Sequence, residues 1–283
     1  MGQIPEPDFR FSSDLVCRLI DHQFPILRDR DPERVGAGYD VEVWRISDDL
    51  VVRLPRRKSA FTFVAREIKH LPSIPQDLPL AVPRIEAVGV ASELLPGPWF
   101  ATQYLPGVSG NEATLAECVR GAADLGVTLA SVHALSTERL DNVSARGVAI
   151  ETRRSFFEHG LDQLPTRARK ISQRYFDVAA GSEIASAKVF LHGDVHRSNL
   201  IVDGGRPTAL IDFGDLGYGD RAGDLGGGIF AVGYAAHQEF LMAYGSVSAA
   251  TRVRSLGWAC YFAVRNFGVG DAYSLEFLES LPI

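Results

Sequence analysis

The stretch His192-Gly193-Asp194-Val195-His196-Arg197-Ser198-Asn199 decides the fold, together with Ile211-Asp212-Phe213-Gly214 a little further along the chain. Short apolar runs at 189–191, 200–202 and 209–211 flank these motifs. Bounded apolar runs of this kind indicate short buried strands. The order of strands and polar residues therefore brings two carboxylates and one carboxamide to one end of three short strands.

That set of side chains is what phosphoryl transfer requires. One carboxylate must orient or deprotonate the attacking hydroxyl, and a second carboxylate with a neutral oxygen ligand must hold Mg²⁺ beside the phosphates. We assign Asp194 to the first task and Asn199 and Asp212 to the second. Loop capping by Asp and Asn would explain each residue singly, but it does not explain the ordered set.

The HGDxxxxN spacing of His192 to Asn199 and the later Ile-Asp-Phe-Gly resemble the aminoglycoside phosphotransferase family. Macrolide phosphotransferases are close relatives, and choline and homoserine kinases share the motif. The resemblance implies a small-molecule kinase of the bilobal protein-kinase-like fold. It also implies ATP or GTP as the phosphate donor, Mg²⁺ as the cofactor and a hydroxyl group as the acceptor.

The resemblance extends to the first hundred residues and implies their roles. Gly36 and Gly38 stand in the family's phosphate-covering loop, Arg53 where kinases place a lysine on the α- and β-phosphates, and Glu67 where a glutamate pairs with it. The interlobe hinge, whose backbone receives the base, would be formed by Gln103, Tyr104 and Leu105.

Arg53 departs from the commonest pattern of the family. No lysine precedes Lys58, which lies beyond Pro55 and is a poorer candidate. Arginine keeps its charge and binds phosphate through two N–H groups, so it can fill the place with altered geometry. A plain exposed strand residue is the alternative, and the Arg-Xaa-Pro sequence resembles that of some macrolide kinases.

Three further residues around the motif are expected to support it. By the resemblance, Asp220 and Asp224 hold loops and helix ends, and Asp224 before Leu225 is expected to cap a helix. His192 is expected to brace the catalytic loop by hydrogen bonding. His196 is expected to be loop surface.

The N-terminal part predicts a small antiparallel sheet with helices. Ser12-Ser13-Asp14 begins a helix of about three turns. Strands at 41–44 and 50–54 form a hairpin. A helix at 59–71 directs Phe63, Ile68 and Leu71 inward, and strands follow at 82–90 and 99–105.

From Glu112 the apolar spacing becomes helical, and helices are expected through 150–180 and, three or four of them, through 222–278. The fold class is therefore α+β. Residues 1–105 are predicted to form an N-terminal nucleotide-binding lobe that ends near the hinge. Residues 106–283 are predicted to form a larger, mainly helical lobe for catalysis and acceptor binding.

Composition bounds the partners and the compartment. The net charge of −6 and the pI near 5.7 of these 283 residues argue against nucleic acid. The three cysteines are far apart and are expected to be reduced and buried. The N-terminus resembles no secretory signal and no stretch is long enough for a membrane span, so we expect no membrane partner and a cytoplasmic location.

Three rival functions remain to be weighed. A protein kinase would carry a long activation segment and an APE motif, but only 71 residues follow Asp212 and none forms APE. A catalytically dead nucleotide-binding module would be expected to lose Asp194 or Asp212. A metabolic kinase of the same fold, acting on a sugar, choline or homoserine, fits the motif equally well.

The acceptor is expected to be an antibiotic, by resemblance to the family. An aminoglycoside is the first expectation, and a macrolide is the runner-up. Exposed carboxylates could attract a polycation, and aromatic side chains of 258–267 could line an apolar pocket, although solvated faces and core packing explain them equally well. The carboxylates are Asp215, Asp271, Glu276 and Glu279, and the aromatic residues are Trp258, Tyr261, Phe262 and Phe267.

Overall fold

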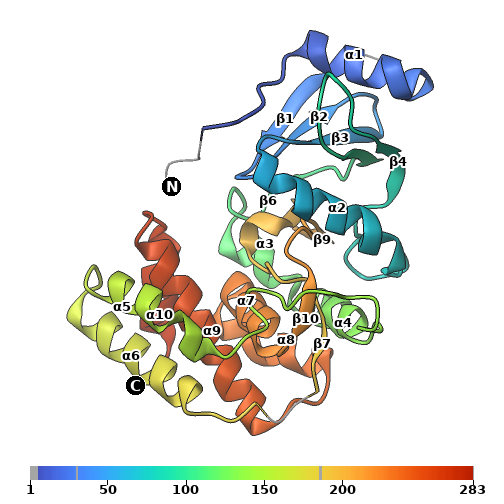
Figure 1. Ribbon diagram of the computed structural model, residues 1–283. Coiled ribbons are helices and arrows are strands. Elements are labelled where there is room, and N and C mark those ends of the chain that lie inside the picture. Colours follow the sequence, from blue (N-terminus) through green and yellow to red (C-terminus); the bar gives the residue numbers. More distant parts are fainter. Residues whose placement is uncertain (1–5, 30, 185–186, 283) are drawn as a thin grey trace. The chain divides into compact units, whose positions relative to one another are not determined.

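The computed structural model describes residues 6–29, 31–184 and 187–282. Its contacts divide the chain into two compact units. The sheet unit comprises Gly2–Gln76 with Val82–Pro106, and the helical unit comprises Asp77–Ala81 with Gly107–Ile283. The mixture of antiparallel sheet and helices confirms the predicted α+β class (Figure 1).

One five-stranded antiparallel sheet organises the sheet unit, with the strand order β1-β2-β3-β5-β4 (Figure 1). The strands are β1 (Glu33–Ala37), β2 (Val41–Arg45), β3 (Leu50–Pro55), β4 (Ile85–Gly89) and β5 (Trp99–Gln103). The helices are α1 (Ser13–Gln23) and α2 (Phe61–His70). Strand β1 was not predicted from the sequence, and it contains Gly36 from the expected glycine loop.

Alternation along β3 sends its side chains to two different environments. Val52 and Leu54 join a buried apolar cluster with Val16 of α1. Arg53, between them, turns the other way and contacts Glu67 of α2. The two helices therefore cover opposite faces of the sheet.

The inward face of α2 differs from the predicted one. Val64, Glu67 and His70 are its buried residues, whereas Phe63 and Ile68 are only half-buried. The prediction followed the largest apolar side chains, but the helix turns a carboxylate inward. A buried partner, Arg53, accounts for that choice because a buried carboxylate needs a hydrogen-bonding counter-charge.

Helices dominate the second unit, and short strands carry the motif. The helices are α3 (Leu115–Val119), α4 (Ala122–His133), α5 (Arg154–Leu161), α6 (Thr166–Ala180), α7 (Ala222–Val232), α8 (His237–Tyr244), α9 (Ala249–Phe267) and α10 (Ala272–Ser280). The strands are β6 (Val108–Ser109), β7 (Val189–Leu191), β8 (Leu200–Asp203), β9 (Arg206–Leu210) and β10 (Gly217–Gly219). Strands β6 and β10 were missed in the sequence because two or three residues give no readable period.

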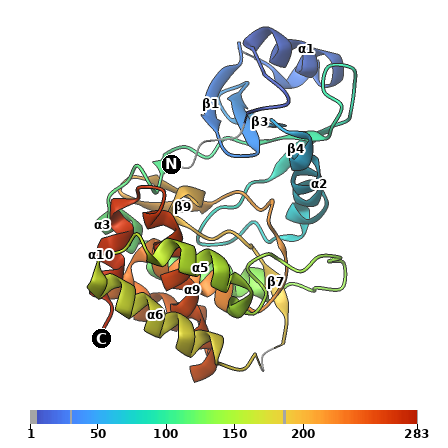
Figure 2. The ribbon, with the colours of Figure 1, turned by 60° about the vertical axis from the view of Figure 1, so that its left-hand side comes forward.

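Helix α9 is central to the packing of this unit. Helices α6 and α7 make extensive contacts with it, and α5 lies beside α6 and α9 (Figure 2). The segment Asp77–Ala81 joins this unit because Leu210 donates its amide to the carbonyl of Ala81. Among the helices that the structure describes, none is long and apolar enough to cross a bilayer.

Candidate active site

The loop after β7 carries Asp194 and is built around a tight backbone approach. Gly193 has a φ of +86°, a region that favours glycine. A Cβ added there would lie 2.1 Å from the carbonyl oxygen of Asp215. A larger residue would therefore displace the backbone immediately before Asp194.

Asp224 holds the start of this loop from the first turn of α7. Its two carboxylate oxygens accept the amides of His192 at 2.7 Å and Gly193 at 3.0 Å. It also contacts Nε2 of His133 at 3.1 Å. Burial raises the pKa of Asp224, but these partners outweigh it and leave the pKa lowered. The capping prediction is wrong in detail, because the carboxylate binds the loop after β7 rather than its own helix.

His192 braces the loop, as expected. Its Nδ1 accepts the amide of Asp194 at 3.1 Å, and its Nε2 lies 3.0 Å from the carbonyl oxygen of Ile211. These two partners require a neutral ring with the proton on Nε2. Burial lowers the pKa of His192, in agreement with that state.

Hydrogen bonds join the three motif segments around Asn199. Its Nδ2 donates to the carbonyl oxygen of Asp194 at 2.9 Å, and its own carbonyl accepts the amide of Ile211 at 2.9 Å. Asn199 is 5% exposed, so its side chain is firmly oriented. Because Nδ2 is used by the loop, Oδ1 is the atom left to act as a ligand.

Asp212 stands at a special point of the backbone. With a φ of +66° it is the one non-glycine residue in the left-handed region among the residues that the structure describes. Asp and Asn tolerate this region better than most residues. Phe213, directly after it, is buried and packs against the ring of His192 at 4.3 Å between centroids.

These side chains fit a magnesium ion held jointly with phosphates. One carboxylate and one amide oxygen are ligands that Mg²⁺ accepts, and it commonly takes few protein ligands where phosphates complete its shell. Across the described residues, no group of three or more His, Cys, Asp or Glu could hold a metal ion alone. Asn199 and Asp212 together offer one amide oxygen and one carboxylate, and phosphates would have to complete the shell of an Mg²⁺ ion held there.

Arg146 was missed in the sequence. It comes from the irregular segment that follows α4, where no motif or period marks it. Its Nη2 lies 2.6 Å from Oδ1 of Asp194, and its Nη1 donates to the carbonyl of Gly193 at 2.7 Å and to Oδ2 of Asp215 at 3.0 Å. The guanidinium thus bridges two carboxylates and the backbone of the catalytic loop.

His196 also contacts Asp194, which corrects its assignment to loop surface. Its Nε2 lies 3.2 Å from Oδ2 of that carboxylate. Burial by itself raises the pKa of Asp194, but the charges of His196 and Arg146 outweigh it and hold the pKa well below its usual range. Asp194 is therefore ionised at neutral pH and is a weak base.

In the sheet unit, Arg53 and Glu67 form a buried ion pair. Nη2 of Arg53 lies 3.2 Å from Oε2 of Glu67, and the two side chains are 9% and 2% exposed. Lys58 is exposed and lies beyond the strand. Arg53 is therefore not the plain exposed strand residue of the alternative, and it is better placed than Lys58 to act with Glu67.

The other predicted nucleotide residues are placed less tightly. A Cβ at Gly36 would meet nothing within 4 Å, and one at Gly38 would lie 3.7 Å from its nearest neighbour, so space is open beside both. The side chain of Gln103 is bound to the backbone of 82–84. The amide of Tyr104 donates to the carbonyl of Asp49 at 2.6 Å, so in this structure it is not offered to a base. Leu105 follows, half-buried.

The candidate acceptor residues fall mostly into structural roles. Trp258, Tyr261 and Phe262 are buried in α9, as ordinary core packing requires, and Phe267 is half-buried. Asp215 is bound by Arg146. Asp271 caps α10, and the exposed Glu276 and Glu279 follow on that helix.

Asp220 supports the fold, as expected. It forms a buried pair with Arg254, whose Nε lies 2.7 Å from Oδ2 of Asp220.

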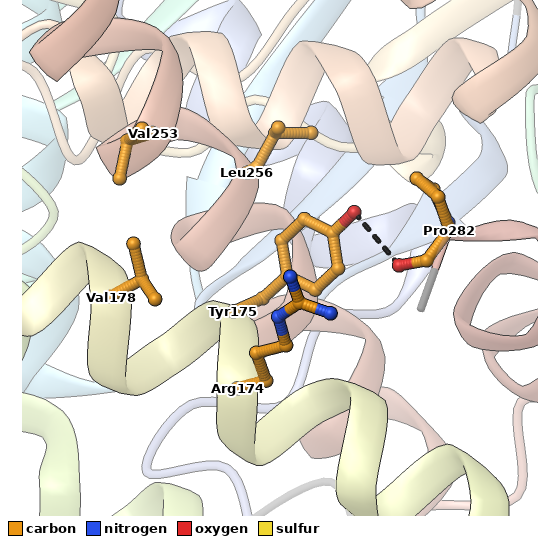
Figure 3. Close-up of a pocket in the computed structure, with 6 residues that line it drawn as sticks. All are labelled: Arg174, Tyr175, Val178, Val253, Leu256 and Pro282. Atoms are coloured by element: carbon orange, nitrogen blue, oxygen red, sulfur yellow. Dashed lines mark hydrogen bonds between the residues drawn. The ribbon is translucent and has the colours of Figure 1, made fainter.

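A separate pocket lies between α6 and α9, and the hydroxyl of Tyr175 donates to the carbonyl of Pro282 at 3.2 Å (Figure 3). Its lining contains none of the predicted site residues and consists of Arg174, Tyr175, Val178, Val253, Leu256 and Pro282.

A family model matches most of the chain. Residues 31–256 match the model of the phosphotransferase enzyme family, APH. The chain belongs to this family of phosphotransferases, enzymes that act on hydroxyl groups. A search of curated protein sequences found no match.

Several solved structures share the fold at low sequence identity. The GDP and kanamycin complex of APH(2")-IIIa is 18% identical with a TM-score of 0.69, over 93% of this chain and 97% of that one. Macrolide 2'-phosphotransferase MphH from Brachybacterium faecium is 22% identical with a TM-score of 0.62, over 94% and 97%. The streptomycin-ATP-APH(2")-IIa complex is 15% identical with a TM-score of 0.61, over 97% and 98%.

Proposed function

We propose that this chain transfers the γ-phosphoryl group of ATP or GTP to a hydroxyl group of a small antibiotic-like molecule. The observation that carries the proposal is the pair of hydrogen bonds made by Asn199, to the backbone of Asp194 on one side and of Ile211 on the other. They join the segments that bear Asp194 and Asp212 into one unit with the donor set that phosphoryl transfer needs.

In this proposal Asp194 orients the acceptor hydroxyl and accepts its proton late in the transfer. The bond from the γ-phosphorus to the bridging oxygen breaks as the bond to the acceptor oxygen forms. The proton of the hydroxyl passes to the carboxylate, and the nucleoside diphosphate leaves. The low pKa of Asp194 favours orientation over early deprotonation, because a weak base gains a proton only once the hydroxyl has become acidic.

Asn199 and Asp212 would hold Mg²⁺, which supplies charge neutralisation at the phosphates when bound. Arg53, fixed by Glu67, would neutralise further phosphate charge from the sheet unit. Gly36 and Gly38 would let backbone approach the phosphates. The backbone of residues 103–105, apart from the Tyr104 amide that is bound to Asp49, would receive the base. Residues 1–105 and 106–283 would then be the nucleotide-binding and the catalytic, acceptor-binding lobes.

Two antibiotic classes remain candidates for the acceptor. Aminoglycosides are the first expectation, and kanamycin and streptomycin are bound by proteins of similar fold. A macrolide is the second, because a macrolide 2'-phosphotransferase has a similar fold at 22% identity. In either case modification would confer resistance. A cytoplasmic location follows from the need for nucleoside triphosphate.

A coupled phosphorylation screen tests the proposal. The purified chain is mixed with Mg²⁺ and either ATP or GTP, and with aminoglycosides, macrolides, choline, homoserine or sugars. We expect one phosphorylated product for each nucleotide consumed with at least one antibiotic. Product from a metabolite alone would identify the metabolic kinase instead. Tight nucleotide binding without turnover of any acceptor would identify a binding module.

A further inference from the structure

Arg146 contacts Asp194, the residue on which the proposed transfer depends, yet it has no part in the proposed nucleotide, metal or acceptor contacts. Its guanidinium contacts Oδ1 of Asp194 at 2.6 Å and Oδ2 of Asp215 at 3.0 Å. Its side chain is 17% exposed. Arginine holds two acceptors through a rigid planar fork, so these contacts fix direction as well as charge.

The segment that carries Arg146 is anchored on both sides of it. Ser144 donates its amide to the carbonyl of Tyr218 at 3.0 Å, and the carbonyl of Gly147 accepts the amide of Asp220 at 2.9 Å. The backbone is also closely packed, because a Cβ added to Gly219 would lie 2.4 Å from the Cα of Gly147. The backbone on both sides of Arg146 is therefore fixed by hydrogen bonds to residues in and next to strand β10.

Charge explains why a guanidinium is useful at this point. The carboxylate of Asp194 must contact the acceptor oxygen while a negatively charged phosphoryl group is transferred to that same oxygen. Two negative groups thus converge on one atom, and their repulsion opposes the transfer. A fixed cation on Oδ1 of the carboxylate offsets part of that repulsion and costs no reorganisation during the reaction.

We propose that Arg146 is a positioning residue for the transfer, which directs the Asp194 carboxylate toward the acceptor hydroxyl and offsets its charge as the phosphoryl group approaches. This inference rests on the proposed function. Asp215 accepts a hydrogen bond from Nη1 of the same guanidinium, and this second contact keeps the guanidinium from rotating away from Asp194.

Kinetics of Arg146→Ala test the role. We expect kcat to fall about 100-fold, as for a lost transition-state contact or a misplaced catalytic group. The KM for the nucleotide should change by less than about threefold, because Arg146 contacts no residue proposed to bind the nucleotide. Arg146→Lys should recover part of the loss, since it restores the charge without the fork.

Three controls separate positioning from a structural role. Arg139→Ala removes an exposed arginine of the same irregular segment after α4, and it should keep wild-type kcat. Methylguanidine at non-denaturing concentration should restore kcat of Arg146→Ala severalfold. In an Asp194→Asn background, Arg146→Ala should have little further effect, because the two residues act as one unit.

The inference is overturned if Arg146→Ala keeps near-normal kcat. It is also overturned if that variant loses thermal stability and nucleotide binding together with kcat and is not rescued by methylguanidine. Failure of the proposed function looks different, because wild-type protein would then phosphorylate none of the antibiotics. The Arg146→Ala comparison then uses the reaction that the wild-type protein does catalyse, transfer to a metabolite or release of phosphate to water, and an unchanged rate overturns the inference.

Discussion

At the scale of single residues, the site depends on how neighbours fix the state of Asp194. Its amide is held by His192, its carbonyl by Asn199, and its carboxylate by Arg146 and His196. Every polar group of the residue thus has a partner from the surrounding structure. The sequence motif identified the residue, but these partners determine its orientation and its charge.

Replacing Asp194 by Asn keeps the shape of the side chain and removes its charge. We expect kcat to fall by about 10²- to 10⁴-fold, the range of a lost catalytic base or orienting group. Nucleotide affinity, measured by fluorescence titration, should be nearly unchanged because Asp194 is not a proposed nucleotide contact. Ser198→Ala, in the same loop, is the control, and near-normal turnover of Asp194→Asn would refute the assignment.

His192 predicts an acid-sensitive stability. Because burial lowers its pKa, the folded state binds fewer protons than the unfolded chain, whose pKa is near 6.5. The free energy of unfolding is unaffected by this group above that pH and falls as the pH drops below it. Burial lowers the pKa of His196, but Asp194 outweighs burial and leaves that pKa raised. His196 therefore works in the opposite direction, and the total change alone does not isolate His192.

Comparison of wild type with His192→Gln isolates the contribution of His192. Urea unfolding at about pH 7.5 and about pH 5.5 should show a smaller acid-induced loss of unfolding free energy in His192→Gln than in wild type. The variant will be less stable at the higher pH, since it loses the brace between Asp194 and Ile211. Equal acid-induced losses in both proteins would contradict a buried, neutral His192.

At the scale of elements, helix α7 connects the core to the catalytic loop. It carries Asp224, which binds the loop amides, and three successive glycines, 226–228, that are fully buried. A Cβ added to Gly227 would lie 2.2 Å from the carbonyl oxygen of Val195, directly after Asp194. The glycines allow the helix axis to approach the loop more closely than any side chain would permit.

Gly227→Ala should therefore act on the loop and not only on the helix. Backbone cannot yield as a flexible side chain would, so we expect a loss of about 1–3 kcal/mol of stability together with a loss of activity. Gly181→Ala, at the end of α6, is the matched control, because its nearest neighbour is at 3.5 Å. Chemical unfolding and kcat of both variants provide the measurement, and equal behaviour of the two would contradict the close approach.

Elements also show what the sequence could and could not reveal. The motif strands, the hairpin at 41–54 and the first helix were predicted because their periods and caps are local signals. The prediction of the inward face of α2 was wrong, because the burial of Glu67 depends on Arg53, a partner fourteen residues earlier in the chain. Arg146 could not be predicted for the same reason, because the residues that it contacts lie 47 and 69 positions away in the sequence.

At the scale of the whole molecule, proposed nucleotide contacts occur in both compact units. Arg53 and Glu67 belong to the sheet unit, and Asn199 and Asp212 belong to the helical unit. A nucleotide that binds the native state and not the unfolded one stabilises the folded chain.

Thermal unfolding with Mg²⁺ and nucleotide measures this stabilisation. At 100 times Kd the nucleotide should add about 2.7 kcal/mol and raise Tm by on the order of 5 °C. A chelator should remove most of the gain and abolish transfer. Arg53→Ala and Asp212→Ala should each reduce it, and an unchanged Mg²⁺ requirement in Asp212→Ala would count against the metal role.

The left-handed backbone of Asp212 imposes a double filter on substitutions at that position. The dihedral angle favours Gly, Asn and Asp, whereas the proposed Mg²⁺ site needs an oxygen ligand, which Asp supplies with a charge and Asn supplies without one. In a saturation library selected for function, Asn should outlast Glu, although Glu keeps the charge. Enrichment of Glu over Asn would show that charge, and not backbone conformation, decides which residues are tolerated at this position.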